Sequence, residues 1–302
     1  MAAPAPTPTP GTVQAVTETA APTPFRAAVR RFARHRTAPA ALIVLAAIAL
    51  SAILAPWIAP YPLGQTNLLA ILQPPSWQHL MGTDPLGTDL FTEVLYGGRI
   101  SLFIGISSAV FGVALGGLVG AVAGYFGGLV DVLLMRLTDI ALSIPALFLI
   151  LVFTRLVGPN PVTIIFMIGI TSWMYPARIM RSQVLSLRER DFVEAARAAG
   201  ARPGRIILHQ IAPNALAPLV VNATLLSGGA IVIEATLDFL GAGLSPPNVS
   251  WGLLLNQAQS NLVNAPWLVV FPSLMVFLVV LSVNVVGDAL RDAMDPTSGP
   301  TA

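Results

Sequence analysis

The chain has 302 residues, of which 55% are hydrophobic and only 10% are charged, and its formal net charge is +2. With a mean hydropathy of +0.77, this composition excludes an ordinary soluble domain and indicates a protein that crosses a membrane several times. Cysteine is absent, which excludes disulfides and thiolate chemistry, and all 16 basic residues are arginine. Without lysine the chain lacks the phosphate-binding group of a Walker A loop, and no basic stripe interleaved with aromatic residues indicates nucleic acid as a partner.

The N-terminal region divides by composition into three parts. Residues 1–24 are mostly alanine, proline and threonine with almost no charge, and we expect them to be disordered. Residues 25–37 carry five arginines opposite a few apolar side chains, which predicts a basic amphipathic helix in contact with membrane lipid; a solvated basic flank fits the same pattern. Residues 38–99 should form a first transmembrane helix, over about 40–59, and then a polar, turn-rich segment outside the membrane.

Three side chains of this outer segment have the chemistry of metal ligands. His79, Asp84 and Asp89 lie among glycine, proline and threonine residues that are typical of turns. Because the three histidines of the chain are far apart, the pattern favours turn-forming and helix-capping roles over a metal site. We therefore expect this chain to bind no metal.

Residues 100–296 are predicted to form the core of the protein, with five further transmembrane helices, and residues 297–302 a short tail. The five apolar runs cover about 100–126, 132–157, 161–175, 215–240 and 266–287. Together with the first helix they predict an all-α polytopic membrane protein with six transmembrane helices. Pro145 predicts a kink in the third helix, and the segment 241–265 is expected to be a loop on the outer side.

Glycine recurs every four residues in and just after the second apolar run. The positions are Gly112, Gly116, Gly120, Gly124 and Gly128. On a helix these residues form a nearly straight groove without side chains, which allows another helix to approach closely. The stripe is therefore interpreted as a helix-packing face.

Two acidic residues, Glu234 and Asp238, lie one turn apart near the predicted outer end of the fifth helix. Intramembrane acids are candidates for a transport pathway, here lining a wet cavity, and ordinary solvation at the outer interface is the equal alternative. A second charged pair, Arg136 and Asp139, lies one turn apart near the start of the third helix. This pair is interpreted as structural rather than as a proton relay.

The segment 191–214, DFVEAARAAGARPGRIILHQIAPN, is a charged island between two apolar halves. Asp191 and Glu194 have the spacing of a capping box, which predicts that a helix starts there. Gly200 is placed to end this helix in a left-handed conformation. A second short helix, with a proline in its first turn, should then stop at Pro213.

Alanines dominate the first of these two helices. Ala195 and Ala196 belong to a low, smooth ridge that can seat in a groove of another protein. An ordinary helical hairpin packed on its own chain fits the same residues.

Arginine is distributed very unevenly along the predicted topology. Six membrane helices place both termini on one side, and with the N-terminus inside, fourteen of the 16 arginines lie in inner segments. Only Arg99 and Arg155 lie in outer segments. This positive-inside bias places both termini and the island in the cytoplasm.

The sequence EAARAAG in the island, with Pro213 and Asn214 downstream, resembles the EAA loop of bacterial ABC-importer permeases. The resemblance covers about residues 78–296. Further segments that resemble the peptide-permease branch of this family, and its C-type subunit, are HLMGTDPLGTD, GGRISLFIG, YFGGLVDVLLMRLTDI, LDFLGAGLSPPNVSWG and GDALRDAMDP. The chain departs from the family's usual His-Ile-Leu-Pro-Asn at 210–214, where it has Gln-Ile-Ala-Pro-Asn, and it has Asp238 where a small serine is common.

The resemblance implies the fold of a type I ABC importer permease, with the island as a cytoplasmic coupling helix that docks into an ATPase subunit. It implies no ATPase site on this chain and no cofactor bound by it, because ATP and Mg²⁺ would bind to partner subunits. The implied partners are a homologous second permease, two ATP-binding subunits and an extracytoplasmic solute-binding protein that contacts residues 60–99 and 241–265. The implied residues of the coupling loop are Asp191, Glu194, Ala195, Ala196, Gly200, Pro213 and Asn214.

The resemblance also implies a place in the bacterial inner membrane and a peptide as the transported solute, with nickel, glutathione or another small solute as alternatives. A different class of protein, an ion-coupled secondary transporter, would use Glu234, Asp238 and the pair of Arg136 and Asp139. The few intramembrane charges and the lack of an evident internal repeat argue against it. A membrane-embedded hydrolase is disfavoured because no nucleophile has a histidine base at a plausible depth.

Overall fold

The structure, a computed structural model, describes residues 32, 33 and 35–294. The expected disordered segment 1–24, most of the expected amphipathic helix 25–37 and the tail 297–302 lie outside the described residues. Within the described part the fold is built of helices, and β-pairing is limited to one isolated bridge between Thr83 and Asp89. The all-α prediction is therefore confirmed.

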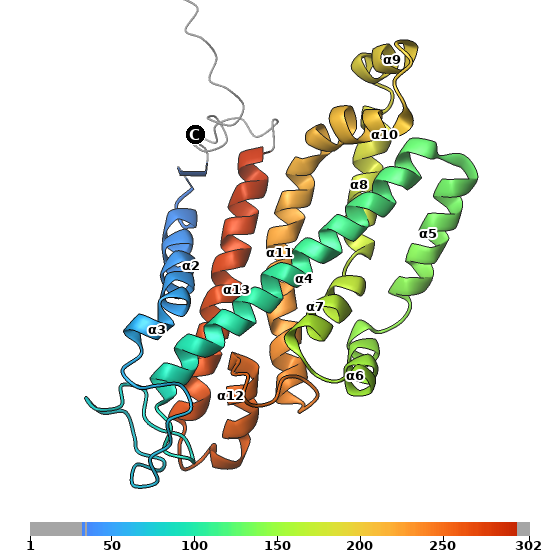
Figure 1. The fold of residues 1–302 in the computed structure, drawn as a ribbon. Coiled ribbons are helices and arrows are strands. Elements are labelled where there is room, and N and C mark those ends of the chain that lie inside the picture. The colour runs from blue at the N-terminus through green and yellow to red at the C-terminus, as the bar shows by residue number, and fades with distance from the viewer. Residues whose placement is uncertain (1–31, 34, 295–302) are drawn as a thin grey trace, which may run out of the picture.

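The first helix, α2 (Ala38–Ile53), ends in a single short turn, α3 (Ala55–Ile58), and residues 59–89 then form the outer segment (Figure 1). The next helix begins at Leu90, ten residues earlier than the apolar pattern predicted. The cause is a side-chain cap, because the Asp89 carboxylate accepts from the Thr92 backbone N–H at 2.9 Å and from its hydroxyl at 2.8 Å. The cap satisfies backbone groups that a helix start leaves free, so the helix extends beyond its apolar part.

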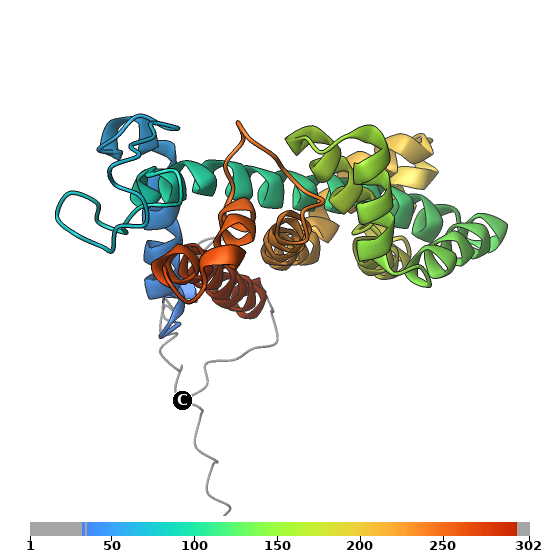
Figure 2. The same ribbon diagram turned by 90° about the horizontal axis from the view of Figure 1, so that it is seen from below.

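This helix, α4 (Leu90–Phe126), has 37 residues and runs diagonally across the molecule (Figure 1). It packs against α2, α7 (Pro161–Ile170), α8 (Met174–Leu187) and α11 (Ala212–Phe239). Seen from below (Figure 2), the elements are spread along α4, with α2 and α13 (Trp267–Met294) near one end and α5 to α8 near the other. The helix α4 therefore connects the two halves of the fold.

The glycine stripe lies where α4 meets α7 and α8. A Cβ atom built on Gly116 would lie 2.2 Å from the backbone carbonyl oxygen of Trp173, and one on Gly120 would lie 2.2 Å from that of Ala177. A Cβ atom built on Gly124 would lie 2.8 Å from a side chain of α8, and one built on Gly112 would lie 3.2 Å from a backbone carbonyl oxygen of α7. Gly116, Gly120 and Gly124 thus have no room for a side chain, and Gly112 has little, as expected of a packing face.

Gly128 does not belong to this face, and its assignment to the stripe was wrong. The helix α4 ends at Phe126, and Gly127 and Gly128 have φ angles of 64° and 53°. No atom lies within 4 Å of a Cβ built on Gly128. The two glycines supply a turn that only residues tolerant of positive φ form easily, and the chain reverses there into α5.

Two apolar stretches are broken rather than straight. The helices α5 (Gly128–Leu142) and α6 (Ala146–Val157) meet at 81°, and α7 and α8 meet at 48°. Pro145 is the N-cap of α6, so the predicted kink is a full break. In addition, Asp139 forms an ion pair with Arg178 at 2.6 Å instead of the expected pair with Arg136.

The remaining helices include the two long ones near the C-terminus, α11 and α13, and the short α12 (Trp251–Ala258), which continues into one 3₁₀ turn, η2 (Gln259–Asn261). Three helical stretches of the described chain are long and apolar enough to cross a bilayer alone, and the two bent pairs raise this number to five. With 16 residues α2 spans about 24 Å, less than a hydrocarbon core of about 30 Å. The count of six spans stays a prediction.

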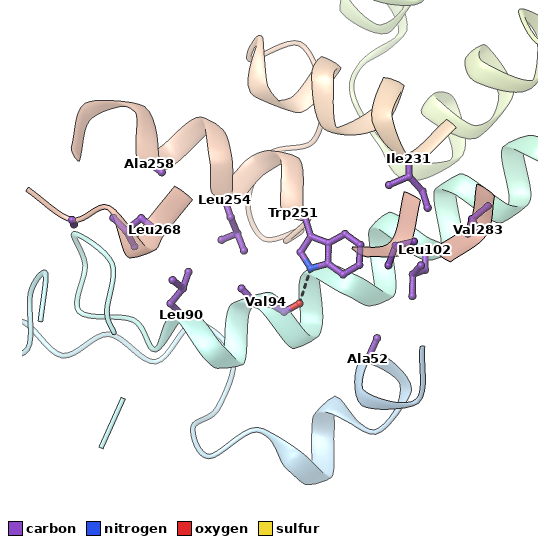
Figure 3. Packing of buried hydrophobic residues seen from close by; sticks show 12 residues of the cluster. Ala52, Leu90, Val94, Leu102, Ile231, Trp251, Leu254, Ala258, Leu268 and Val283 are labelled. Carbon is purple, nitrogen blue, oxygen red and sulfur yellow. Dashed lines mark hydrogen bonds between the residues drawn. The ribbon is translucent and has the colours of Figure 1, made fainter. Parts of the chain in front are cut away.

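The segment 241–265 is not a simple surface loop, as the sequence suggested, but carries α12 into the core. Trp251 is 1% exposed, and its indole N–H donates to the carbonyl of Val94 at 2.9 Å (Figure 3). Gly98 and Gly252 allow this approach, because a Cβ on Gly98 would lie 2.9 Å from the indole and one on Gly252 2.6 Å from the backbone of α11. The wedge formed by α12 therefore holds the N-terminal part of α4 and the C-terminal part of α11 together.

The neighbouring glycines of α4 provide a test of this packing. We expect Gly116→Ala to destabilise the fold by about 1–3 kcal/mol, because the new methyl group would overlap the backbone of α8. Gly117→Ala is the matched control, since its Cβ would meet only a side chain at 3.5 Å and alanine favours the helix. Thermal unfolding of the detergent-solubilised protein measures both. Equal unfolding temperatures for the two variants would contradict the packing role of the stripe.

Candidate functional site

The charged island forms a small hairpin that projects beyond the ends of the long helices (Figure 1). It consists of α9 (Asp191–Ala198), α10 (Pro203–Ile206) and a turn of π-helix, η1 (Ile207–Ile211). Its apolar residues Val193, Ile206 and Ile211 are buried in one cluster with side chains of α4, α8 and α11. The hairpin is therefore anchored to the helices that precede and follow it.

The start of α9 differs from the expected capping box. Arg190, not Asp191, is the N-cap residue, and no side chain caps the helix. Asp191 and Glu194 both lie in the first turn and are exposed. Their negative charges there favour the helix through its dipole, and both remain accessible to another molecule.

The end of α9 has the predicted left-handed residue. Gly200 has a φ of 75°, its N–H donates to the carbonyl of Arg197 at 3.0 Å, and the N–H of Ala201 donates to that of Ala196 at 3.1 Å. These two bonds are those of a Schellman motif, which reverses the chain directly after a helix. Among the described residues, no atom lies within 4 Å of a Cβ built on Gly200, so the requirement for glycine there is one of backbone conformation.

The second part of the hairpin does not stop at Pro213. The chain passes from α10 through η1 into α11, and Pro213 lies in the first turn of that long helix. A proline is tolerated there because it needs no N–H partner. In the preceding turn the N–H of Ala212 donates to the carbonyl of Ile207, five residues back, and the side chain of Asn214 donates to the carbonyl of Gln210 at 2.6 Å.

The two central alanines of α9 point in different directions. Ala195 is exposed, whereas Ala196 is half-buried against the apolar cluster under the hairpin. The free face also carries Phe192, which is 40% exposed and which the sequence did not single out. A lone aromatic residue in a helix of alanines and charges was the available signal, because exposed aromatic side chains often dominate protein interfaces.

Glu234 and Asp238 are enclosed in the protein, and neither line a wet cavity nor face outer solvent, which corrects both expectations. Asp238 accepts from the N–H of Leu244 at 2.5 Å and from the hydroxyl of Ser250. The hydroxyl of Ser101 lies 3.4 Å from Glu234. The acids are buried because α12 and the turn before it cover them, so their role is to join α4, α11 and α12.

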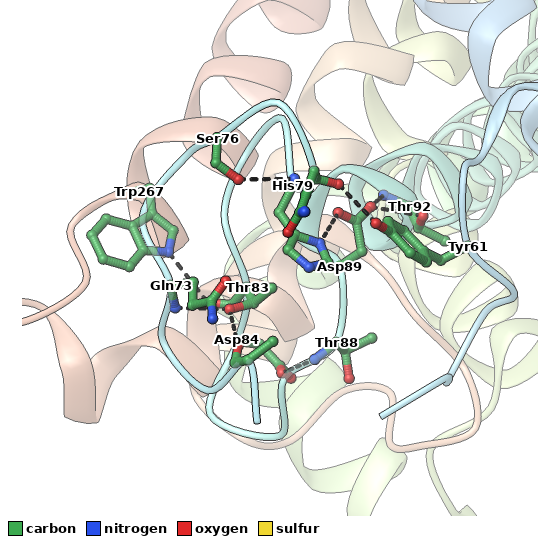
Figure 4. A network of polar contacts seen from close by, with 12 residues as sticks. Tyr61, Gln73, Ser76, His79, Thr83, Asp84, Thr88, Asp89, Thr92 and Trp267 are labelled. Carbon is green, nitrogen blue, oxygen red and sulfur yellow. Dashed lines mark hydrogen bonds and ion pairs between the residues drawn. The ribbon is translucent and has the colours of Figure 1, made fainter. Parts of the chain in front are cut away.

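The outer segment is held by a polar network (Figure 4). His79 Nδ1 lies 3.0 Å from a carboxylate oxygen of Asp89, which also caps α4, and the indole N–H of Trp267 donates to the carbonyl of Thr83 at 3.2 Å. Asp84 accepts from two backbone N–H groups of its turn; burial raises the pKa of its carboxyl, and these hydrogen bonds oppose the rise. Turn and capping roles for the three residues are thus confirmed, and the described residues contain no group of three or more metal-ligating side chains.

One cavity of 480 Å³ lies between this outer segment and the turn before α12. Asp84 and Glu93 line it together with mostly apolar side chains. The sequence did not reveal Glu93 as a site residue, because the first turns of α4 were taken as part of a loop. The segments that line this cavity include α12 and the outer segment, which lie at the end of the molecule opposite α9 (Figure 1).

The chain matches two known families. Residues 116–298 match the family described as the binding-protein-dependent transport system inner membrane component, and residues 23–75 match the N-terminal TM domain of oligopeptide transport permease C. A chain of the inward-facing MetNI methionine ABC transporter has a similar fold, with a TM-score of 0.53 and 24% identity over 67% of this chain and 96% of that one.

Relatives with known names are similar over almost their whole length. The dipeptide transport system permease protein DppC of Alkalihalophilus pseudofirmus is 39% identical over 96% of this chain and 95% of its own. The oligopeptide transport system permease protein OppC of Haemophilus influenzae is 41% identical over 89% and 87%. A putative peptide transport system permease protein of Brucella abortus is 41% identical over 93% and 98%. The chain is thus a multi-pass membrane protein, and it belongs to the family of binding-protein-dependent transport system inner membrane components.

Proposed function

We propose that this chain is one of two permease subunits of an ATP-driven importer of peptides in the bacterial inner membrane. The names of its relatives, which are dipeptide and oligopeptide permeases, support the peptide as the solute. The second subunit would be a homologous permease that completes the pathway, and an extracytoplasmic solute-binding protein would deliver the peptide. Two ATP-binding subunits would bind ATP and Mg²⁺, so this chain would itself be no enzyme and bind no cofactor.

The observation that carries this proposal is the projecting hairpin of α9 and α10. Its free face offers Asp191, Phe192, Glu194 and Ala195, which suit a groove with an apolar floor and a basic rim. Its buried face shares one apolar cluster with α4, α8 and α11. Movement of an ATPase subunit against α9 would therefore reach the membrane helices through direct packing, and would open the pathway alternately to the two sides.

The alternative of an ion-coupled transporter gains no support. The acids on which it depends, Glu234 and Asp238, are closed off by α12 and do not line the cavity. Asp139, the other acid it needs, pairs with Arg178 on α8. These groups are accounted for by contacts between helices, so the importer remains the single proposed function.

The coupling role can be tested at Gly200. In the reconstituted complex, we expect Gly200→Ala to lower the ATPase activity stimulated by the binding protein about 5- to 30-fold. The methyl group costs about 1–2 kcal/mol in the left-handed conformation and so depopulates the docked hairpin. Combining it with Glu194→Ala should lower the stimulation further, because a charge at the docking surface is lost.

Gly204→Ala is the matched control for this experiment. Gly204 lies on the same hairpin, has no positive φ and would have nothing within 4 Å of its Cβ. We expect stimulation in this variant to equal that of the wild type. Wild-type stimulation in Gly200→Ala as well would contradict the coupling role.

The proposed orientation can be tested because the chain has no cysteine of its own. We introduce Val263→Cys beyond α12, where the side chain is 92% exposed, and Arg205→Cys on the hairpin, which is also exposed. A membrane-impermeant maleimide should label Val263→Cys in right-side-out vesicles and Arg205→Cys only in inside-out vesicles. The reverse pattern would place the hairpin outside the cell and exclude the proposed coupling.

A further inference from the structure

The cavity at the outer end of the molecule has features that helix packing does not explain. Its volume of 480 Å³ lies within the range of about 300–1,000 Å³ that is common for small-molecule sites. Three segments form most of its walls: 63–66, the turn 84–88 and, far away in the sequence, 246–257, which includes most of α12. Most wall residues are apolar, among them Leu63, Leu86 and Leu253.

Glu93 is the exceptional wall residue. Its side chain projects from the first turn of α4, the residue is 9% exposed, and its Oε2 atom is buried without a hydrogen-bond partner within the described part of the chain. Burial of an unpaired carboxylate oxygen is costly, because the group loses water and gains nothing in return. The position therefore lacks a donor, and a positively charged donor would satisfy it best.

The acidic residues near Glu93 make the site more favourable for a positively charged group. Asp84 lines the same cavity, and its Oδ1 atom is already used by the N–H groups of Leu86 and Thr88. The charges of Asp84 and Asp89 act on Glu93, and Asp89 is occupied by His79 and the start of α4. Within the part of the chain that the structure describes, the cavity wall contains no arginine or histidine. A cation supplied by another molecule would therefore meet no competing positive charge from this wall.

The chemistry of the walls distinguishes between kinds of cation. Calcium takes six to eight oxygen ligands and magnesium six, and the described residues contain no group of three or more histidine, aspartate or glutamate side chains that could hold such an ion. A primary ammonium group on an apolar body needs one unpaired carboxylate oxygen, acceptors such as Asn248 and Gln257 at the wall, and apolar surface for its stem. A second hollow beside Glu93 has a volume of only 10 Å³, which holds at most one water molecule.

We propose that this cavity is a subsite for the amino-terminal ammonium group of the transported peptide. The inference rests on the proposed function, which supplies the peptide and makes this end of the chain the outer one. The ammonium group would bind Glu93, and the first side chain of the peptide would lie against the apolar wall. The site would thus hold the amino end of a peptide as it leaves the binding protein, with the weak affinity that onward movement requires.

The test uses the purified complex of permease and ATPase subunits without the binding protein, so that only the permease subunits contact the peptide. Saturation-transfer NMR, which suits weak ligands, would compare trialanine with N-acetyl-trialanine. We expect trialanine to bind the wild type, and Glu93→Gln to weaken this binding at least about tenfold, because a charge-assisted hydrogen bond is lost. The acetylated peptide, which has no ammonium group, should bind weakly to both.

Glu234→Gln is the matched control, because Glu234 also has a buried, unpaired carboxylate oxygen but does not line the cavity. It should bind trialanine like the wild type. A second variant, Leu86→Trp, fills the cavity from its exposed side without changing a charge and should also weaken binding. Unfolding temperatures of all three variants show whether each remains folded.

Several results would overturn the inference. One is that trialanine binds equally well to the wild type and to Glu93→Gln. Another is that the acetylated peptide binds the wild type as well as trialanine does. A third is that butylammonium binds in a Glu93-dependent way while trialanine does not bind at all. Uptake of trialanine by the complete wild-type transporter is measured in parallel. If uptake is absent, the proposed function fails; if uptake occurs and trialanine binding does not depend on Glu93, only the subsite fails.

Discussion

The close contact between α4 and α8 is the constraint on which the rest of the structure depends. In a membrane, lipid solvates apolar side chains as well as protein does, so helices associate mainly through close van der Waals contact. Gly116 and Gly120 bring the backbones of the two helices together over consecutive turns. This contact fixes α8, and α8 leads directly into the projecting hairpin.

The same helix determines the geometry of the opposite end. The first turns of α4 carry the Asp89 cap, Glu93 and the carbonyl that receives the indole of Trp251. The helix α4 has 37 residues. It contacts α8, which supports the hairpin, and it also contributes Glu93 to the outer cavity, so one helix connects the two regions. The contacts of α9 with α8 and the contact of Trp251 with Val94 therefore lie at opposite ends of α4.

The sequence predicted the features that depend on local patterns. Apolar runs located the long helices, the spacing of Gly112 to Gly124 located the packing face, and the position of Gly200 after the alanines predicted its left-handed conformation. Each of these follows from a few neighbouring residues. The proposal that the hairpin acts in coupling came from the resemblance of its motif to a family, because a solvent-exposed alanine helix has no specific pattern of its own.

The features that the sequence did not predict depend on contacts between distant segments. The early start of α4 is due to a polar cap in front of a turn that contains Glu93 and therefore does not look apolar. Glu234 and Asp238 are buried because Trp251 draws α12 over them. The outer cavity needs two segments within residues 63–88 and a third, 246–257, more than a hundred residues later, so no local pattern could indicate it.

The π-helical turn between the hairpin and α11 affects the orientation of the hairpin. Such a turn contains one residue more than the α-helix it replaces, and removal of one residue from 207–211 would let the helix continue without interruption. Each residue of an α-helix corresponds to about 100° of rotation about the axis. Removal of one residue there would therefore turn the exposed face of α9 by about 100° about the axis of α11, toward a different neighbour.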